Sequence, residues 1–363
     1  MKKSQKDQNP RRKKDKECYI PKIPDLVCQK LIGSGHFSSV FRGSYKGRSP
    51  VSIKIIDTNH DSEILKEIRI LQRIKGCPHT INIIEALKIE KNTNKIVQVY
   101  TQEKGKLSTM QIKDYHDTNS TDNDNDYDYY SESSEGFVTI LIIDYIEAMS
   151  LHHFYHHVKL KYFQRVLKDI FESLASVHSK NVVHRDITEN NVLVTPDFKH
   201  GFLIDWGCST IIEPNKPLRP NSGSRQFRSP EMLFNYKFYD TKCDIWSVGV
   251  YILSVLCGHS VPWRTTNPRD VLLIMFEFYG NKPFLKLASD LNISLNSVFG
   301  SEFIESTTDE PTKAFEDCFS KKFKCLQHPL LISLMKDLLR VDPKERPTAE
   351  AVLNHEFFSS KFH

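Results

Sequence analysis

The sequence predicts an α+β fold with two lobes, a small strand-rich lobe followed by a larger helical one. Between residues 26 and 100, β-rich runs at 28–32, 38–42, 51–56 and 83–89 surround one helix-like segment at 62–74. After residue 150, apolar side chains recur at i, i+3, i+4 and i+7 over residues 161–179, as in an amphipathic helix. Residues 244–256 are apolar nearly all round, which indicates a helix buried in a large domain.

The chain is expected to contain a basic disordered tail at residues 1–25, a first lobe at 26–147 and a second lobe at 148–363. Residues 101–136 interrupt the first lobe, and their core at 114–135 has eight Asp or Glu and no Lys or Arg. Such a segment cannot bury enough apolar surface to offset its ordering entropy, so it predicts a disordered acidic insert. A strand at 138–144 follows the insert, and an apolar stripe at 330–339 lies near the end of the second lobe.

Composition limits the class of protein. Apolar residues make up 39% of the chain and charged residues 26%, which allows a sizeable core and excludes wholesale disorder. No apolar stretch approaches the ~20 residues that cross a bilayer, and the N-terminus lacks the apolar core of a signal peptide. The eight cysteines are scattered, which favours reduced thiols over a disulfide framework. We therefore expect an intracellular protein that does not contact a membrane.

The net charge of +5 is unevenly distributed. Residues 1–17 carry +5 and residues 114–135 carry −8, which leaves +8 for the rest of the chain. A basic body favours a polyanionic partner or substrate. The run Arg11-Arg12-Lys13-Lys14 is interpreted either as a nuclear-import signal or nucleic-acid contact, or as a solubilising tail. No direct sequence-specific binding to nucleic acid is expected.

A glycine-rich stretch and a lysine on the next strand predict a phosphate site. The stretch LIGSGHFSSV at residues 31–40 carries Gly33 and Gly35 between two strand runs, where backbone amides can approach phosphate oxygens. Lys54 ends the strand motif V-S-I-K and can neutralise phosphate charge. Glu67, on the helix at 62–74, is expected to pair with Lys54; Glu63 is the alternative.

The strongest evidence lies in the second lobe, in VHRDITENN at residues 183–191 and LIDWG at 203–207. Asp186 is expected to accept a hydrogen bond from the substrate hydroxyl, whereas Asn191 and Asp205 are expected to bind Mg²⁺. The chemistry needs separate carboxylates, because a metal ligand cannot also act as the base. Ser229-Pro230-Glu231 follows at the expected distance, and together these motifs predict phosphoryl transfer.

These motifs resemble those of eukaryotic serine/threonine protein kinases over residues 26–358. Within that superfamily the chain is most similar to the cell division cycle 7 family, through GSGHFSSVFRG, GSRQFRSPEML, TKCDIWSVGVYILSVLCG and RVDPKERPTAEAVLNHEFF. The runner-up is the casein kinase two catalytic subunit, which shares the DWG motif and an S-R-x-F sequence. The resemblance implies the two-lobed kinase fold, with one regulatory helix in the small lobe, and ATP and Mg²⁺ as cofactors. It also implies an acidophilic kinase in replication initiation and cell-cycle control, a regulatory subunit, and a nuclear location with some cytoplasmic protein.

The resemblance also assigns residues to the nucleotide site and to supporting contacts. Asp244 should hydrogen-bond the catalytic-loop backbone, Arg346 should pair with Glu231, and Ser224 should contact Asp186 through its hydroxyl. The residues expected to contact ATP are Ile32, Gly33, Ser34, Gly35, Val40, Lys54, Ile143, Asp144 and Ile146.

Two departures from the family pattern bear on activity and regulation. Thr188 replaces the lysine that usually touches the γ-phosphate, which leaves a weakly active kinase-fold scaffold as an alternative function. The segment between Asp205 and Glu231 is short, which puts the mode of regulatory-subunit binding in doubt. Basic residues in this segment suit carboxylates or phosphates flanking the acceptor hydroxyl, or a phosphorylated residue of the chain itself; they are Lys216, Arg219, Arg225 and Arg228.

A histidine-rich run lies after residue 150. His152 and His156, like His153 and His157, are spaced i, i+4, a spacing that metal sites use. No third ligand is apparent nearby in the sequence. An exposed helix is therefore favoured over a zinc site.

Overall fold

The structure is a computed structural model that describes residues 19–35, 38–58, 60–103, 106–111, 136–265, 267–299 and 308–362. The chain divides into two compact units. The first comprises Met1–Asn59, Glu85–Thr101 and Thr109–Ile142; the second comprises His60–Ile84, Gln102–Ser108 and Ile143–His363. The predicted fold class, a β-rich part and a larger helical part, is confirmed.

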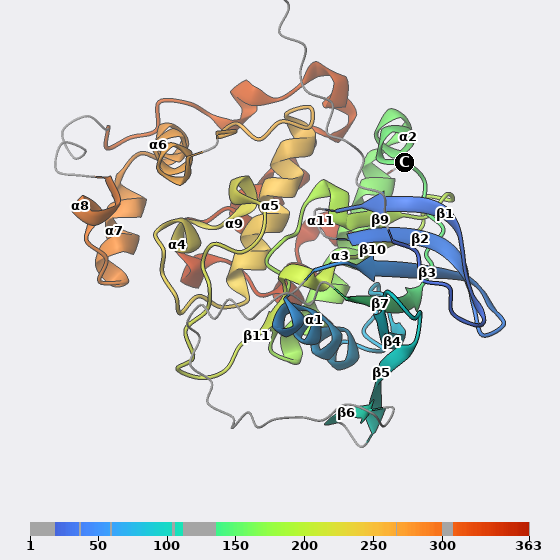
Figure 1. The fold of residues 1–363 in the computed structure, drawn as a ribbon. Coiled ribbons are helices and arrows are strands. Elements are labelled where there is room, and N and C mark those ends of the chain that lie inside the picture. The colour runs from blue at the N-terminus through green and yellow to red at the C-terminus, as the bar shows by residue number, and fades with distance from the viewer. Residues whose placement is uncertain are drawn as a thin grey trace, which may run out of the picture. The chain divides into compact units, whose positions relative to one another are not determined.

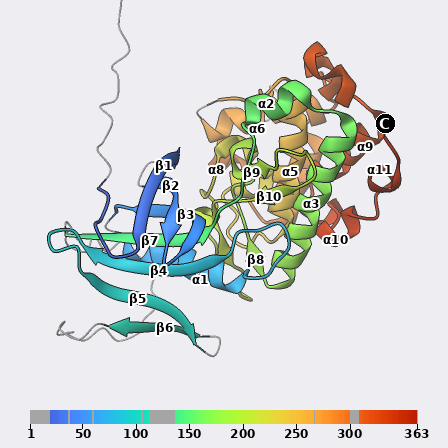
Figure 2. The ribbon, with the colours of Figure 1, turned by 90° about the vertical axis from the view of Figure 1, so that its right-hand side faces the viewer.

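Strands dominate the first unit. Within the described residues they form a seven-stranded sheet in the order β1-β2-β3-β7-β4-β5-β6, and Figure 2 shows β4, β5 and β6 lying side by side at one edge. β1, β2 and β3 are antiparallel neighbours, and their inward side chains such as Phe41, Ile53 and Ile55 are buried. The strands are β1 (Leu26–Ser34), β2 (Ser38–Tyr45), β3 (Arg48–Ile56), β4 (Ile83–Glu90), β5 (Ile96–Glu103), β6 (Lys106–Gln111) and β7 (Phe137–Asp144).

The acidic insert predicted at residues 101–136 includes residues that the structure places in strands. Residues 101–103 belong to β5 and residues 106–111 form β6, so their assignment to a disordered insert is wrong. β6 is the edge strand of the sheet. An edge strand is held by backbone hydrogen bonds to a single neighbour and can tolerate a polar sequence, which is why composition misled the prediction. Residues 112–135, like the basic tail up to residue 18, lie outside the described residues.

The second unit contains the helices. They are α1 (Asp61–Arg73), α2 (Leu151–His157), α3 (Leu160–Ser179), α4 (Pro230–Leu233), α5 (Lys242–Leu256), α6 (Pro268–Tyr279), α7 (Lys282–Asp290), α8 (Leu295–Phe299), α9 (Pro329–Leu338), α10 (Ala349–Val352) and α11 (Glu356–Ser359). Two short antiparallel pairs accompany them, β8 (Val182–Val183) with β11 (Thr210–Ile211), and β9 (Val192–Val194) with β10 (Gly201–Leu203). α1 contacts the turn Trp206–Cys208 and β11 within this unit.

The core of the helical unit forms around α3 and α5 (Figure 1). α3 buries one face, including Phe163, Ile170 and Leu174, as its periodicity predicts. From Cys243 to Leu256 every side chain of α5 is buried, which confirms the helix that the sequence placed inside a large domain. Each large apolar side chain so buried contributes roughly 1.5–3 kcal/mol. No helix within the described ranges is long and apolar enough to span a membrane.

Candidate active site

Asp186 lies in the loop between β8 and β9, and a buried aspartate fixes the backbone of that loop. Asp244, in the first turn of α5, accepts hydrogen bonds from the backbone N–H groups of His184 and Arg185, both at 2.8 Å. Its Oδ2 also lies 2.9 Å from His178 Nε2. Burial alone would raise the pKa of Asp244, but the hydrogen bond and charge of His178 and the other donors hold it below its usual value. The predicted support of the catalytic loop by Asp244 is confirmed.

Arg185 joins the catalytic loop to the segment that follows Asp205. Its backbone has φ of 67°, a left-handed conformation that is uncommon for a residue with a side chain. The buried guanidinium donates from Nε to Cys208 O at 2.7 Å and from Nη1 to Tyr239 Oη at 3.1 Å. These bonds tie the loop to two segments that are distant in sequence, and so limit the motion of the neighbouring Asp186.

The β9–β10 hairpin brings the two predicted Mg²⁺ ligands to one end. Val192 pairs with Leu203, so Asn191 just before β9 and Asp205 just after β10 lie at the same end of the hairpin. The backbone N–H of Ile204 donates to Asn191 O at 3.0 Å. Asp205 is exposed and has φ of 60°, and such strained positions are concentrated at functional sites.

Asn191 also contacts Asp186 directly. Its Nδ2 donates to Asp186 O at 2.8 Å and to Asp186 Oδ2 at 3.2 Å, which fixes which end of the amide points at Asp186. The amide oxygen therefore points elsewhere, and with the Asp205 carboxylate it supplies the hard oxygen ligands that Mg²⁺ prefers. The residues present fit a magnesium ion.

Of the two glutamates of α1 that could act at the site, Glu67 is the one buried beside the turn after Asp205. It is 7% exposed, and a Cβ on Gly207 would lie 3.6 Å from its Oε2 and 3.4 Å from Asp205 Oδ1. Glu63 instead is exposed and lies 3.8 Å from Arg219. The structure thus brings Glu67, rather than Glu63, to the turn after Asp205. The pairing of Glu67 with Lys54 stays a prediction.

In the first unit, the predicted phosphate site lies on three adjacent strands. Gly33 of β1 pairs with Val40 of β2, and Val40 pairs with Lys54 of β3. Directly paired residues project on the same face of a sheet, so the side chains of Val40 and Lys54 share a face. The backbone of Gly33 lies next to Val40 on the edge strand β1. Gly35 N donates to Ser38 O at 2.7 Å, and Ile32 is 45% exposed. This arrangement fits a nucleotide, with amides and a lysine for phosphate and an apolar side chain for the base.

The predicted adenine contacts begin at the end of β7. Ile143 is buried and Ile146 is half-buried. The Asp144 carboxylate accepts from Asn82 Nδ2 at 2.7 Å and from Asn82 N at 3.2 Å, and Asp144 N donates to Asn82 O. The side chain of Asp144 therefore binds the loop after α1, and a contact of Asp144 with ATP stays a prediction.

The segment from Asp205 to Glu231 packs on the catalytic loop. Ser224 contacts Asp186 through its backbone N–H, which donates to Oδ1 at 2.8 Å; the predicted contact exists, but its donor is the amide rather than the hydroxyl. Gly223 has φ of 71°, and a Cβ there would lie 1.9 Å from Arg185 O, so only glycine fits. Asp186 is thus held between Asn191 and this segment.

The arginines of this segment have different surroundings. Arg228 donates to the carbonyls of Asn221, Ser222 and Gly223, and its pKa is lowered by burial and then by Arg225. It is therefore a structural cation for the segment and not a free substrate contact. Within the described residues, Arg225 has a buried Nε with no hydrogen-bond partner.

Glu189 has a role that was not predicted from the sequence. Thr188 is buried at the start of the short helix Glu189–Asn191, and the Glu189 carboxylate lies 2.7 Å from His259 Nδ1 and accepts from Ser254. Glu189 therefore anchors the catalytic loop to the end of α5. No local sequence signal reveals this contact, because Ser254 and His259 are far along the chain.

Comparisons with known proteins agree with this geometry. A family model described as "Protein kinase domain" matches residues 125–358. The casein kinase II subunit alpha' of Saccharomyces cerevisiae is 26% identical over 342 residues, covering 94% of this chain and 86% of that protein. A probable serine/threonine-protein kinase of Dictyostelium discoideum is 25% identical over 335 residues, covering 92% of this chain but 47% of its own length.

Proposed function

This chain belongs to the protein kinase domain family and is a serine/threonine kinase, and we propose that it phosphorylates hydroxyls flanked by acidic or phosphorylated residues. Protein kinases use ATP and Mg²⁺, and bound ATP supplies the phosphoryl group while Mg²⁺ offsets its negative charge. The aspects specific to this chain are the residues that act and the choice of substrate.

The contacts described above support the following roles. Asp186, held by Ser224 N and Asn191, accepts a hydrogen bond from the acceptor hydroxyl and orients it. The oxygens of Asn191 and Asp205 bind the metal, and Lys54 with the backbone at Gly33 and Gly35 binds phosphate.

The observation that carries the substrate proposal is the orphaned donor of Arg225. A buried N–H without a partner costs roughly 1–3 kcal/mol, so a ligand acceptor at this position would gain that energy back. Arg225 and Asp186 both act on the pKa of Arg228, which places the three charges in one neighbourhood. A carboxylate or phosphate next to the acceptor hydroxyl accepts charge-assisted hydrogen bonds of the kind a guanidinium offers.

The test compares three serine peptides that differ only in flanking residues: acidic, alanine or basic. The acidic peptide should have the highest kcat/KM, and Arg225→Gln should raise KM for this peptide by about tenfold, the equivalent of ~1.4 kcal/mol. KM for the alanine peptide should change little. Arg340→Gln, which removes an exposed arginine paired with Asp337, is the matched control and should leave both unchanged. A preference for basic or proline-rich flanks in the native enzyme would overturn the proposal.

Narrower roles depend on the sequence resemblance. The motifs favour the cell division cycle 7 type, with replication initiation, a regulatory subunit and a nuclear location. The similarity to the yeast casein kinase II subunit alpha' favours a casein kinase two type instead. The need for a regulatory subunit is tested by measuring the activity of the purified chain with and without a candidate subunit. Full activity of the chain without the subunit would contradict that need. Alanine replacement of the run at residues 11–14 tests nuclear import by microscopy.

A further inference from the structure

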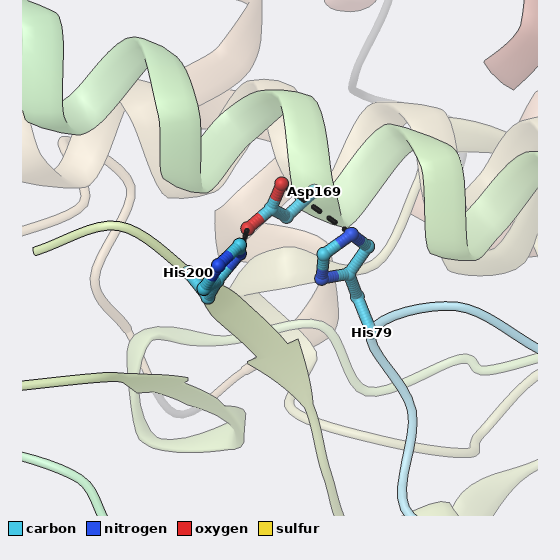
Figure 3. Close-up of side chains that lie close together, drawn as sticks. All are labelled: His79, Asp169 and His200. Atoms are coloured by element: carbon cyan, nitrogen blue, oxygen red, sulfur yellow. Dashed lines mark ion pairs between the residues drawn. The ribbon is translucent and has the colours of Figure 1, made fainter.

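Three ionisable side chains that take no part in the phosphotransfer site meet in the helical unit. His79 lies in the loop after α1, Asp169 on α3 and His200 in the turn that leads into β10, and Figure 3 shows Asp169 between the two imidazoles. One ligand atom from each residue lies within 4.8 Å of the other two.

Several pairs of these ligand atoms are separated by distances close to those around a tetrahedral metal ion. His79 Nε2 lies 3.5 Å from Asp169 Oδ1, and His200 Nδ1 lies 3.4 Å from Asp169 Oδ2. Glu172, one turn further along α3, places Oε2 3.3 Å from His79 Nε2. Bonds of about 2.0–2.1 Å from zinc to nitrogen and oxygen give ligand–ligand distances of about 3.3–3.4 Å in a tetrahedron. The two histidines approach different oxygens of Asp169, so for either oxygen two of the six separations of a four-ligand site exist already.

The backbone holds the three segments in this arrangement. Leu203 N donates to His79 O at 2.9 Å, and Gly201 N donates to Asp169 Oδ2 at 2.8 Å. The imidazoles of His79 and His200 are stacked, with 5.9 Å between ring centroids. These bonds hold in place the segments that carry the three side chains.

Accessibility also suits a metal ion. The side chain of His200 is 55% exposed and that of Glu172 is 36% exposed, which leaves an entry path, whereas those of His79 and Asp169 are only 17% and 11% exposed. Two imidazoles with one or two carboxylates form a donor set suited to zinc and similar divalent transition metals, but poorly suited to Mg²⁺.

We propose that His79, Asp169 and His200 bind one zinc-class divalent ion, with Glu172 or a water molecule as the fourth ligand. The ion braces the loop after α1, the middle of α3 and the β9–β10 hairpin. The same hairpin carries Asn191 and Asp205 at its other end, and α1 carries Glu67. The site therefore stabilises the elements that position the phosphotransfer residues, and takes no part in the chemistry.

The test uses the full chain, first stripped of metal with a chelator. Zinc is then titrated against a chromophoric competitor, and Co²⁺ is added separately because its visible absorption reports tetrahedral coordination. We expect one tight equivalent, a tetrahedral Co²⁺ spectrum and a higher Tm with zinc. His200→Ala, at the most exposed ligand, should fold normally and weaken zinc binding at least about tenfold. Asp169→Asn should weaken it as well.

The matched control is the double variant His153→Ala, His157→Ala. These α2 histidines are four residues apart, and their ring centroids are 4.4 Å apart. The double variant therefore tests adventitious binding of zinc to a histidine pair. The control should retain the affinity of the native chain. The proposal is overturned if no stoichiometric zinc binds, if a folded His200→Ala chain binds as tightly as the native one, or if the α2 double variant loses the binding.

Discussion

At the scale of single residues, buried charges are satisfied by several partners at once. Arg346 and Glu231, both almost fully buried, form two hydrogen bonds of 2.8 Å, which confirms the pair expected from the sequence. Arg346 also donates to the carbonyls of Arg340, Val341 and Lys242. The pair therefore fixes the end of the segment after Asp205 to the loop before α10.

Removing one partner of this pair should be costly. We expect Arg346→Ala to lower the free energy of unfolding by about 3–5 kcal/mol, because it leaves Glu231 as a buried, uncompensated charge. Arg340→Ala is the control, since its exposed pair with Asp337 should be worth about 0–1 kcal/mol. Denaturant unfolding measures both. A loss for Arg346→Ala no larger than that of the control would show that the pair does not support the fold.

At the scale of elements, the catalytic loop has little secondary structure of its own and depends on the first turn of α5. Asp244 accepts two backbone N–H groups, so both of its oxygens must be acceptors. In Asp244→Asn, one of these positions becomes an NH₂ group that faces an N–H donor. We expect the loop to shift and kcat/KM to fall roughly 10²-fold, with the chain still folded by circular dichroism. Unchanged kinetics would exclude a positioning role for Asp244.

The same residue predicts a dependence of stability on pH. The pKa of Asp244 is lower in the folded chain than the ~3.9 of an unperturbed aspartate, so its contribution is fully present above that value. It is lost as the pH falls below about 4 towards the folded-state pKa. Unfolding free energies measured from pH 7 to pH 3 should therefore decline more steeply for the native chain than for Asp244→Asn. Equal slopes would contradict the lowered pKa.

The periodicity of apolar residues and the spacing of motifs predicted most helices and strands. They could not predict contacts between segments that are far apart in the sequence. The apolar pattern of α3 and α5 was sufficient, because burial alone determines those helices. β6 was missed because an edge strand needs backbone pairing rather than apolar side chains. The spacing of Asn191 and Asp205 identified them because a short hairpin joins them, whereas the cluster around Asp169 joins three segments that are far apart in the chain.

At the scale of the whole molecule, the distribution of net charge can be counted directly from the sequence. The chain outside the basic tail and the insert carries +8, and residues 114–135 carry −8. Opposite charges of this size attract each other within a Debye length, which is about 8 Å at physiological ionic strength. We therefore expect the acidic segment to compete with acidic substrates for basic side chains of the chain.

Deleting residues 114–135 should raise kcat/KM for an acidic peptide at low salt, and the gain should shrink as salt is added. The control keeps the length and replaces the acidic residues of the segment by Asn and Gln, and it should behave like the deletion. Steady-state kinetics at several salt concentrations make the measurement. A deletion that lowers activity, or a gain that does not depend on salt, would show that the segment does not act through its charge.

Phosphoryl transfer to a hydroxyl oriented by Asp186 can be checked in a single assay. Purified native chain, Asp186→Asn and the control Asp337→Asn, at a half-buried position of α9, are incubated with labelled ATP, Mg²⁺ and an acidic serine peptide. The native chain and Asp337→Asn should phosphorylate the peptide at similar rates. Asp186→Asn, still folded, should be slower by roughly 10²–10⁴-fold, the usual contribution of a positioned base. Equal rates for the native chain and Asp186→Asn would contradict the assignment, as would the absence of transfer by the native chain.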